Sequence, residues 1–245
     1  MPFAAVDSVI GSPPIQFSGL VADAAARLQP GQLVTASDNW WGTGEFIYAK
    51  AAGTIRAFGL CVLTPAFNST TNTYDWNATE VPNTANLGRM LCVSAVALTS
   101  GQFSWFQVTG LCPVNCQASV AADTTFGIAA AGQGGANSAG KQILNARVVA
   151  AATTTVAKTN SFAQSGSAVL TVSSADGWFP GAFLSGTGIA AATTVSSIDP
   201  SGRFVTLSAV TTAPVTGTVT ATYNNAAIFY NVAHLNRPFA QGAIT

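Results

Sequence analysis

Short stretches in which apolar and polar residues alternate, separated by glycine, proline and asparagine, constrain the fold of this chain more than any other feature. A period of two places successive side chains on opposite faces of a β-strand. Residues 45–50, 169–172, 194–198 and 204–207 follow this period, with turn-forming residues between them. No long stretch has the period of an amphipathic helix. The pattern therefore predicts an all-β protein whose main domain is a small β-barrel or sandwich.

Breaks in this pattern divide the 245 residues into an arm, a main domain and a second module. Residues 1–30 are expected to form an extended N-terminal arm that contains prolines, ending in a short helix over residues 18–28. Residues 31–160 together with 224–245 are predicted to form the main β-barrel domain. Residues 161–223 are predicted to form an inserted, sandwich-like β-module.

The connections between these parts are also predicted from local patterns. Residues 228–232 form the last predicted strand, which is expected to pair with the segment near Val148 across the inserted module. Residues 65–88 are rich in Asn, Thr and Pro and are interpreted as a long polar loop, whereas residues 117–120 are interpreted as a strand. Residues 199–202 (Asp-Pro-Ser-Gly) predict a hairpin turn, because proline presets the turn and glycine accepts a positive φ.

The chain carries very little charge. Charged residues make up 7% of it, whereas soluble domains average about 25%. Nine Lys and Arg balance nine Asp and Glu, so no basic surface for binding nucleic acid is expected. The apolar stretches are shorter than the roughly 20 residues of a membrane-spanning helix, so no membrane segment is expected. A surface with near-zero net charge favours association, which predicts that other subunits cover much of it.

The motifs that could support catalysis or hold a cofactor are incomplete. Residues 135–141 have the spacing of a phosphate-binding loop, but Gln142 stands where Ser or Thr would bind magnesium. The pair Cys112 and Cys116 permits a disulfide or part of a zinc site, although buried free thiols are the favoured interpretation. His234 is the only histidine, so it would have to serve any nucleophile as base. We expect no enzyme activity and no cofactor.

Three tryptophans raise carbohydrate binding as an alternative. Trp40, Trp41 and Trp76 could stack on sugar rings if they are exposed, although buried aromatic residues and interface anchors are commoner.

Three stretches resemble sequences of a known protein family. They are GTGEFIYAKAAGTIRAFGLCVL from Gly42, GQFSWFQVTG over residues 101–110, and a run of small residues that ends in LNARV. Through them, residues 31–158 resemble the small β-barrel decoration, or cement, proteins found on the heads of tailed bacteriophages. The segment GWFPGAFLSGTGIAAATTVSSIDPSGRFVTLS resembles a β-module that recurs in phage head and tail structural proteins.

The resemblance implies a structural virion protein without catalytic residues, bound to the outside of the capsid. Such proteins bridge neighbouring capsomers, often as homotrimers, so the implied partners are the major capsid protein and further copies of this chain. The implied location is the capsid surface of the virion, after assembly in the host cytoplasm. The residues expected at capsid or subunit contacts are Phe3, Ile15, Phe17, Trp40, Trp41, Arg237, Pro238 and Phe239. The alternative is a phage tail or fibre component with carbohydrate-binding (adhesin) activity.

Overall fold

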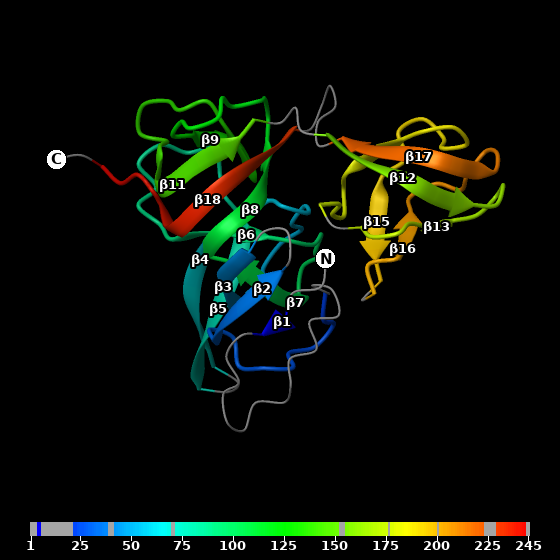
Figure 1. The fold of residues 1–245 in the computed structure, drawn as a ribbon. Helices are drawn as coiled ribbons and strands as arrows, with labels where there is room; N and C mark the ends of the chain where they lie inside the picture. The colour runs from blue at the N-terminus through cyan, green and yellow to red at the C-terminus, as the bar shows by residue number, and fades with distance from the viewer. Residues whose placement is uncertain are drawn as a thin grey trace.

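The fold consists of β-strands arranged in three sheets (Figure 1). The predicted all-β class is thus confirmed. The computed structural model describes residues 4–5, 22–38, 42–69, 72–151, 155–175, 177–199, 201–222 and 229–243.

The first sheet contains a closed ring of five strands, called the first barrel. In ring order these strands are β3 (Gly42–Ala51), β5 (Thr73–Glu80), β4 (Leu60–Asn68), β6 (Leu91–Ser94) and β7 (Phe103–Gln107). The ring closes where β7 pairs with β3, from Phe46 opposite Gln107 to Lys50 opposite Phe103. Outside the ring, β2 (Leu33–Asp38) pairs with β3, and β1 (Ala4–Ala5) pairs with β2. Small residues such as Ala49, Ala78, Cys61 and Cys92 occupy the interior, which suits the narrow lumen of a five-stranded ring.

The second sheet forms the second barrel. Its order is β11 (Ile143–Ala150), β18 (Phe229–Ala240), β8 (Thr109–Cys116), β10 (Gln133–Gly135) and β9 (Gly127–Ala130). Backbone hydrogen bonds between the β9 end and the β11 end of this order close the barrel. The N–H of Ile128 donates to the carbonyl of Lys141, and the N–H of Ile143 donates to the carbonyl of Phe126. Val148 lies opposite Ala233. The pairing predicted between the last strand and the segment near Val148 is therefore confirmed.

The six strands between β11 and β18 form the third barrel. Its order is β14 (Phe183–Ser185), β17 (Val215–Thr222), β12 (Thr155–Ala163), β13 (Val169–Thr171), β16 (Phe204–Leu207) and β15 (Val195–Ile198). A bridge between Phe183 and Thr194 joins the two ends of this order, so the sheet closes on itself. Its first strand begins at Thr155, before the start expected at residue 161.

The first and second barrels share a core. Leu60 and Val62 of β4 belong to the same buried cluster as Val114 of the second barrel. Cys61 and Leu63, at the alternate positions, belong to the interior cluster of the first barrel. Because both faces of β4 are covered at these positions, its first four residues are all buried.

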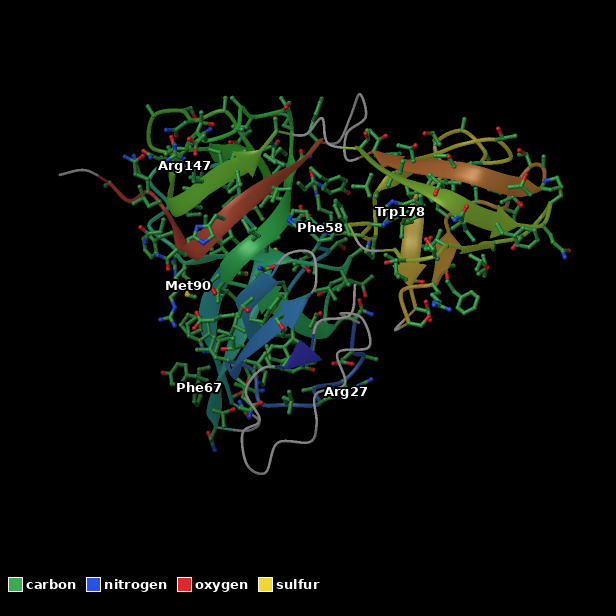
Figure 2. The ribbon with its side chains drawn as sticks, viewed as in Figure 1. Arg27, Phe58, Phe67, Met90, Arg147 and Trp178 are labelled. Atoms are coloured by element: carbon green, nitrogen blue, oxygen red, sulfur yellow. The ribbon has the colours of Figure 1, made fainter. Side chains whose placement is uncertain are left out.

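Three aromatic side chains, one from each barrel, meet at one junction. Phe58 precedes β4, Tyr230 lies on β18, and Phe179 lies in the loop before β14. The ring centroids of Phe58 and Phe179 are 4.6 Å apart, and each ring lies 5.4–5.8 Å from that of Tyr230 in edge-to-face geometry. Figure 2 shows Phe58 between the first two barrels and the third barrel. The trio therefore attaches the third barrel to the other two.

The predicted helix over residues 18–28 is absent from residues 22–28, the part that the structure describes. Asp23 instead makes two backbone hydrogen bonds with Phe103 at the edge of β7, as an isolated β-bridge, and residues 24–25 and 27–28 are bends. The hydroxyl of Tyr48 donates to the Asp23 carboxylate, which also pairs with Arg27 at 2.8 Å. These tertiary contacts outweigh the local helix preference.

The predicted polar loop over residues 65–88 is wrong over most of its length. Residues 65–68 continue β4, and residues 73–80 form β5, with eight paired positions between the two strands. Asn and Thr favour turns locally, but cross-strand pairs such as Phe67 with Tyr74 stabilise a hairpin here.

The strand predicted at residues 117–120 is wrong as well. The strand lies earlier in the chain, as β8, and includes Pro113. Proline is tolerated at this position because β10 pairs with β8 only at Cys116.

The predicted turn at residues 199–202 is present between β15 and β16. Gly202 has a φ of 68°, and its N–H donates to the carbonyl of Asp199; Pro200 lies outside the described residues. The Asp199 carboxylate accepts hydrogen bonds from the Ser201 hydroxyl at 2.6 Å and from the N–H groups of Ser201, Arg203 and Phe204. These donors, the Ser201 hydroxyl first among them, lower the pKa of Asp199 to about 2.

We expect Asp199→Ala to lower the free energy of unfolding by about 1 kcal/mol at pH 7 through loss of these hydrogen bonds. Because the folded pKa is depressed, the stabilisation is complete above the ordinary value of 3.8 and is lost as the pH falls toward about 2. Thermal unfolding of both proteins from pH 7 to pH 2 should show their difference shrinking below pH 4. Asp199→Asn, which keeps one acceptor oxygen without the charge, should lose less at pH 7. A difference that stays constant down to pH 2 would contradict this role.

Candidate functional site

Five of the eight predicted contact residues, Phe3, Ile15, Phe17, Trp40 and Trp41, lie outside the described residues.

The remaining three follow each other on β18 and have different environments. The exposed guanidinium of Arg237 pairs with Glu45 of β3 at 3.3 Å, and Pro238 is buried within the chain. Phe239 is partly exposed, and it lies opposite Leu144, another partly exposed apolar residue, on β11. Of the three, Phe239 therefore offers apolar surface to a partner, whereas Arg237 already has a partner within the chain.

The incomplete phosphate-binding motif lies in a turn between two strands. It runs from the end of β10 to the start of β11, so a strand and not a helix follows Lys141. The Lys141 ammonium donates to the side-chain oxygen of Asn83 at 2.8 Å. A phosphate-binding loop relies on the N–H groups of a following helix, and this turn lacks that element.

All four cysteines are buried and free, as the sequence favoured. Burial raises the pKa of the Cys116 thiol to about 12 and also raises the pKa values of Cys92 and Cys112. Neutral thiols of this kind act as small apolar side chains. Within the described ranges, His, Cys, Asp and Glu residues form no group of three or more that could bind a metal ion. The described residues also contain no helix that could span a membrane.

One exposed apolar surface lies on the outer part of the β4–β5 hairpin. Beyond Leu63, β4 and β5 pair mainly with each other, and Pro65 lies opposite Trp76 as Phe67 lies opposite Tyr74. Residues directly opposite or two apart in a hairpin share a face. These four residues, called the ribbon face, therefore form one apolar strip, which includes Phe67 at the lower left of Figure 2.

The ribbon face is anchored at one end and exposed at the other. Trp76 packs on Gly31, where an added Cβ would lie 2.5 Å from the indole ring. Phe67 and Tyr74 are 57% and 68% exposed, with ring centroids 5.4 Å apart. On the opposite face, Asp75 accepts hydrogen bonds from Asn68 and Gln29, so the hairpin is held from its polar side. Exposed apolar patches with polar surroundings mark interaction sites.

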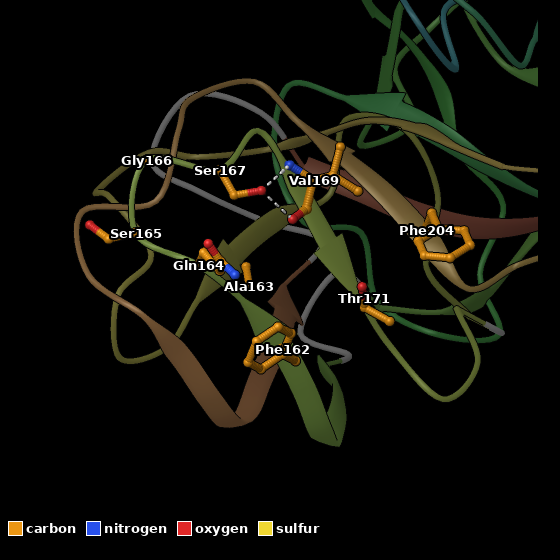
Figure 3. A pocket seen from close by; sticks show the side chains of 9 residues that line it. All are labelled: Phe162, Ala163, Gln164, Ser165, Gly166, Ser167, Val169, Thr171 and Phe204. Carbon is orange, nitrogen blue, oxygen red and sulfur yellow. Dashed lines mark hydrogen bonds between the residues drawn. The ribbon is translucent and has the colours of Figure 1, made fainter.

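A second exposed apolar surface is a groove on the third barrel (Figure 3). Its volume is about 440 Å³, and nine uncharged residues line it. They are Phe162, Ala163, Gln164, Ser165, Gly166, Ser167, Val169, Thr171 and Phe204. The volume falls within the roughly 300–1,000 Å³ of small-ligand sites.

The two aromatic rings of the groove come from strands on either side of β13. Phe162 of β12 lies opposite Thr171 of β13, which in turn lies opposite Phe204 of β16. Residues that lie opposite each other point to the same face, so Thr171 separates the two rings, as Figure 3 shows. Phe162 is 53% exposed and Phe204 is 50% exposed.

Hydrogen bonds hold the loop that forms one wall of the groove. The Ser167 hydroxyl bonds to both the N–H and the carbonyl of Val169. The Thr211 hydroxyl donates to the carbonyl of Gln164, and the N–H of Gly166 donates to the carbonyl of Thr211. The loop is therefore fixed before any ligand arrives.

No known protein family, curated protein or solved structure matches this chain. Its function is therefore inferred from these two surfaces. Pro65 and Phe67 occupy every second position of one segment, and Tyr74 and Trp76 do so in the next. This spacing is a sequence signal for the ribbon face. The groove has no comparable signal, because the barrel brings together two phenylalanines that are far apart in the chain.

Proposed function

We propose that the protein is a structural component of a bacteriophage virion, which binds the outer surface of the capsid and stabilises it by bridging capsomers. The observation that carries the proposal is the ribbon face, with two adjacent aromatic rings more than half exposed at the end of a hairpin. The resemblance of residues 31–158 to decoration proteins supports the same function.

The physical mechanism is burial of apolar surface against a partner. Each large apolar side chain contributes about 1.5–3 kcal/mol when it passes from water to a fully buried site. A single pair of rings binds weakly once the loss of translational freedom is included. In a homotrimer, three ribbon faces would engage the capsid together, and the effective concentration of the second and third contacts strengthens attachment. The balance of nine cations against nine anions leaves little net charge repulsion between copies.

The proposal is tested by adding the purified chain to capsids stripped of it and measuring how much sediments with them. We expect the unaltered chain to rebind. The double variant Phe67→Ser and Tyr74→Ser should bind at least about tenfold more weakly, which corresponds to about 1.4 kcal/mol.

The matched control is Phe162→Ser, which removes a similarly exposed ring from the third barrel. It should rebind like the unaltered chain, and thermal unfolding should show that all variants are folded. Failure of the unaltered chain to bind capsids would overturn the proposal. Full binding by the ribbon variant would exclude the ribbon face as the attachment surface.

A further inference from the structure

We propose that the groove on the third barrel is a binding site for a neutral glycan, with sugar rings stacked on Phe162 and Phe204. This site lies on a different barrel from the ribbon face, so the inference does not rest on capsid attachment.

The first argument is the register of the aromatic rings. Thr216, Phe162, Thr171 and Phe204 lie opposite one another on four adjacent strands, so aromatic and hydroxyl side chains alternate across the barrel surface. Adjacent strands are about 4.8 Å apart, which places the two phenylalanines about 10 Å apart with Thr171 between them. Two ring platforms at this separation, with a hydroxyl between them, match the first and third units of a linear saccharide, because successive sugar rings lie about one strand spacing apart.

The second argument is the chemistry of the lining. A sugar ring presents apolar C–H groups on its faces and hydroxyl groups around its edge. The groove offers aromatic and aliphatic surface from Phe162, Phe204 and Val169, and polar groups from Thr171 and Gln164. All nine lining residues are uncharged, so the groove has no ionic complement for a phosphate, sulfate or carboxylate group. Charge complementarity therefore favours a neutral saccharide over an anionic one.

The third argument is that the site is formed in advance. The hydrogen bonds of Ser167 and Thr211 fix the wall, and the barrel strands fix both rings. Binding then requires little ordering of the protein, which reduces the entropic cost of capturing a weakly interacting ligand. Stability alone also does not explain Phe162 and Phe204, since about half of each ring is exposed to water and contributes no burial to the fold.

The test uses the full chain and a panel of neutral oligosaccharides of two to six units, built from glucose, galactose, mannose and N-acetylhexosamines. Sialylated and sulfated saccharides and short apolar peptides are measured beside them, by calorimetry or by NMR chemical-shift changes. We expect at least one neutral saccharide to bind in the groove. Phe162→Ala and Phe204→Ala should each weaken that binding about tenfold or more. Thr171→Val, which keeps the shape without the hydroxyl, should weaken it several-fold.

Val210→Ala is the matched control, because Val210 is 53% exposed on the same barrel and does not line the groove. It should bind the saccharide like the unaltered chain, as should the variant of Phe67 and Tyr74. Absence of neutral saccharide binding, tighter binding of anionic saccharides or peptides, or binding unaffected by loss of either ring would overturn the inference. Saccharide binding without capsid binding would refute the proposed function alone, and the reverse result would refute this inference alone.

Discussion

Replacement of Phe179 by alanine is expected to lower the free energy of unfolding by about 3–5 kcal/mol, the usual cost of removing a fully buried ring. Phe179 is almost completely buried between Phe58 and Tyr230, which belong to the other two barrels. The junction is also closely packed beside Tyr230. Gly181 approaches the Tyr230 hydroxyl so closely that an added Cβ would lie 2.8 Å from it.

The variant should also loosen the third barrel from the other two. Chemical denaturation should show the lower stability, and small-angle X-ray scattering should show a larger radius of gyration than for the unaltered chain. Phe204→Ala is the control, because half of that side chain is already exposed, and it should cost far less. Equal stability losses for the two variants, or an unchanged radius of gyration, would show that the aromatic junction does not hold the barrels together.

Gly110→Ala is the second substitution with a large expected effect, about 2–5 kcal/mol of lost stability. Gly110 has a φ of 91°, which an L-residue adopts only with strain. An added Cβ would lie 2.5 Å from the Thr43 carbonyl oxygen and 2.9 Å from the Gly44 Cα. Both obstacles are backbone atoms of β3, so no side chain can move aside. This close approach occurs where the chain leaves β7 of the first barrel and enters β8 of the second.

Gly101→Ala is a closely matched control for this prediction. Gly101 has the same φ of 91°, but an added Cβ there would meet no atom within 4 Å. Gly101→Ala should therefore lower the free energy of unfolding only through backbone strain, by about 1–2 kcal/mol. Denaturant titration of the two variants measures the difference, which isolates the steric contribution at Gly110. Equal losses would mean that β3 and β8 can separate at little cost.

Local patterns predicted those elements whose side chains alternate without interruption. Residues 204–207 form a strand as expected, and the hairpin turn at residues 199–202 is present because its carboxylate and glycine act within the turn itself. The same reasoning failed where distant contacts outweighed local preference. Asp23 is held in a β-bridge by Phe103, and residues 73–80 are held as a strand by β4.

The candidate surfaces follow the same division. Both halves of the ribbon face alternate visibly in the sequence, although the abundance of Asn and Thr around them favoured a loop. The groove depends on β13, which brings Phe162 and Phe204 to the same face although 41 residues separate them in the chain. No local pattern contains that information, because barrel order is set by long-range pairing.

The amino-acid sequence alone determined that this protein is built of β-strands and carries almost no charge, since strand period and ionisable side chains are properties of neighbouring or single residues. The tertiary structure decided that the strands close into three barrels, that Phe58, Phe179 and Tyr230 join them, and which aromatic rings remain exposed. Those features arise from pairing and packing between segments far apart in the chain, where many arrangements satisfy the same local pattern and only the complete set of contacts selects one.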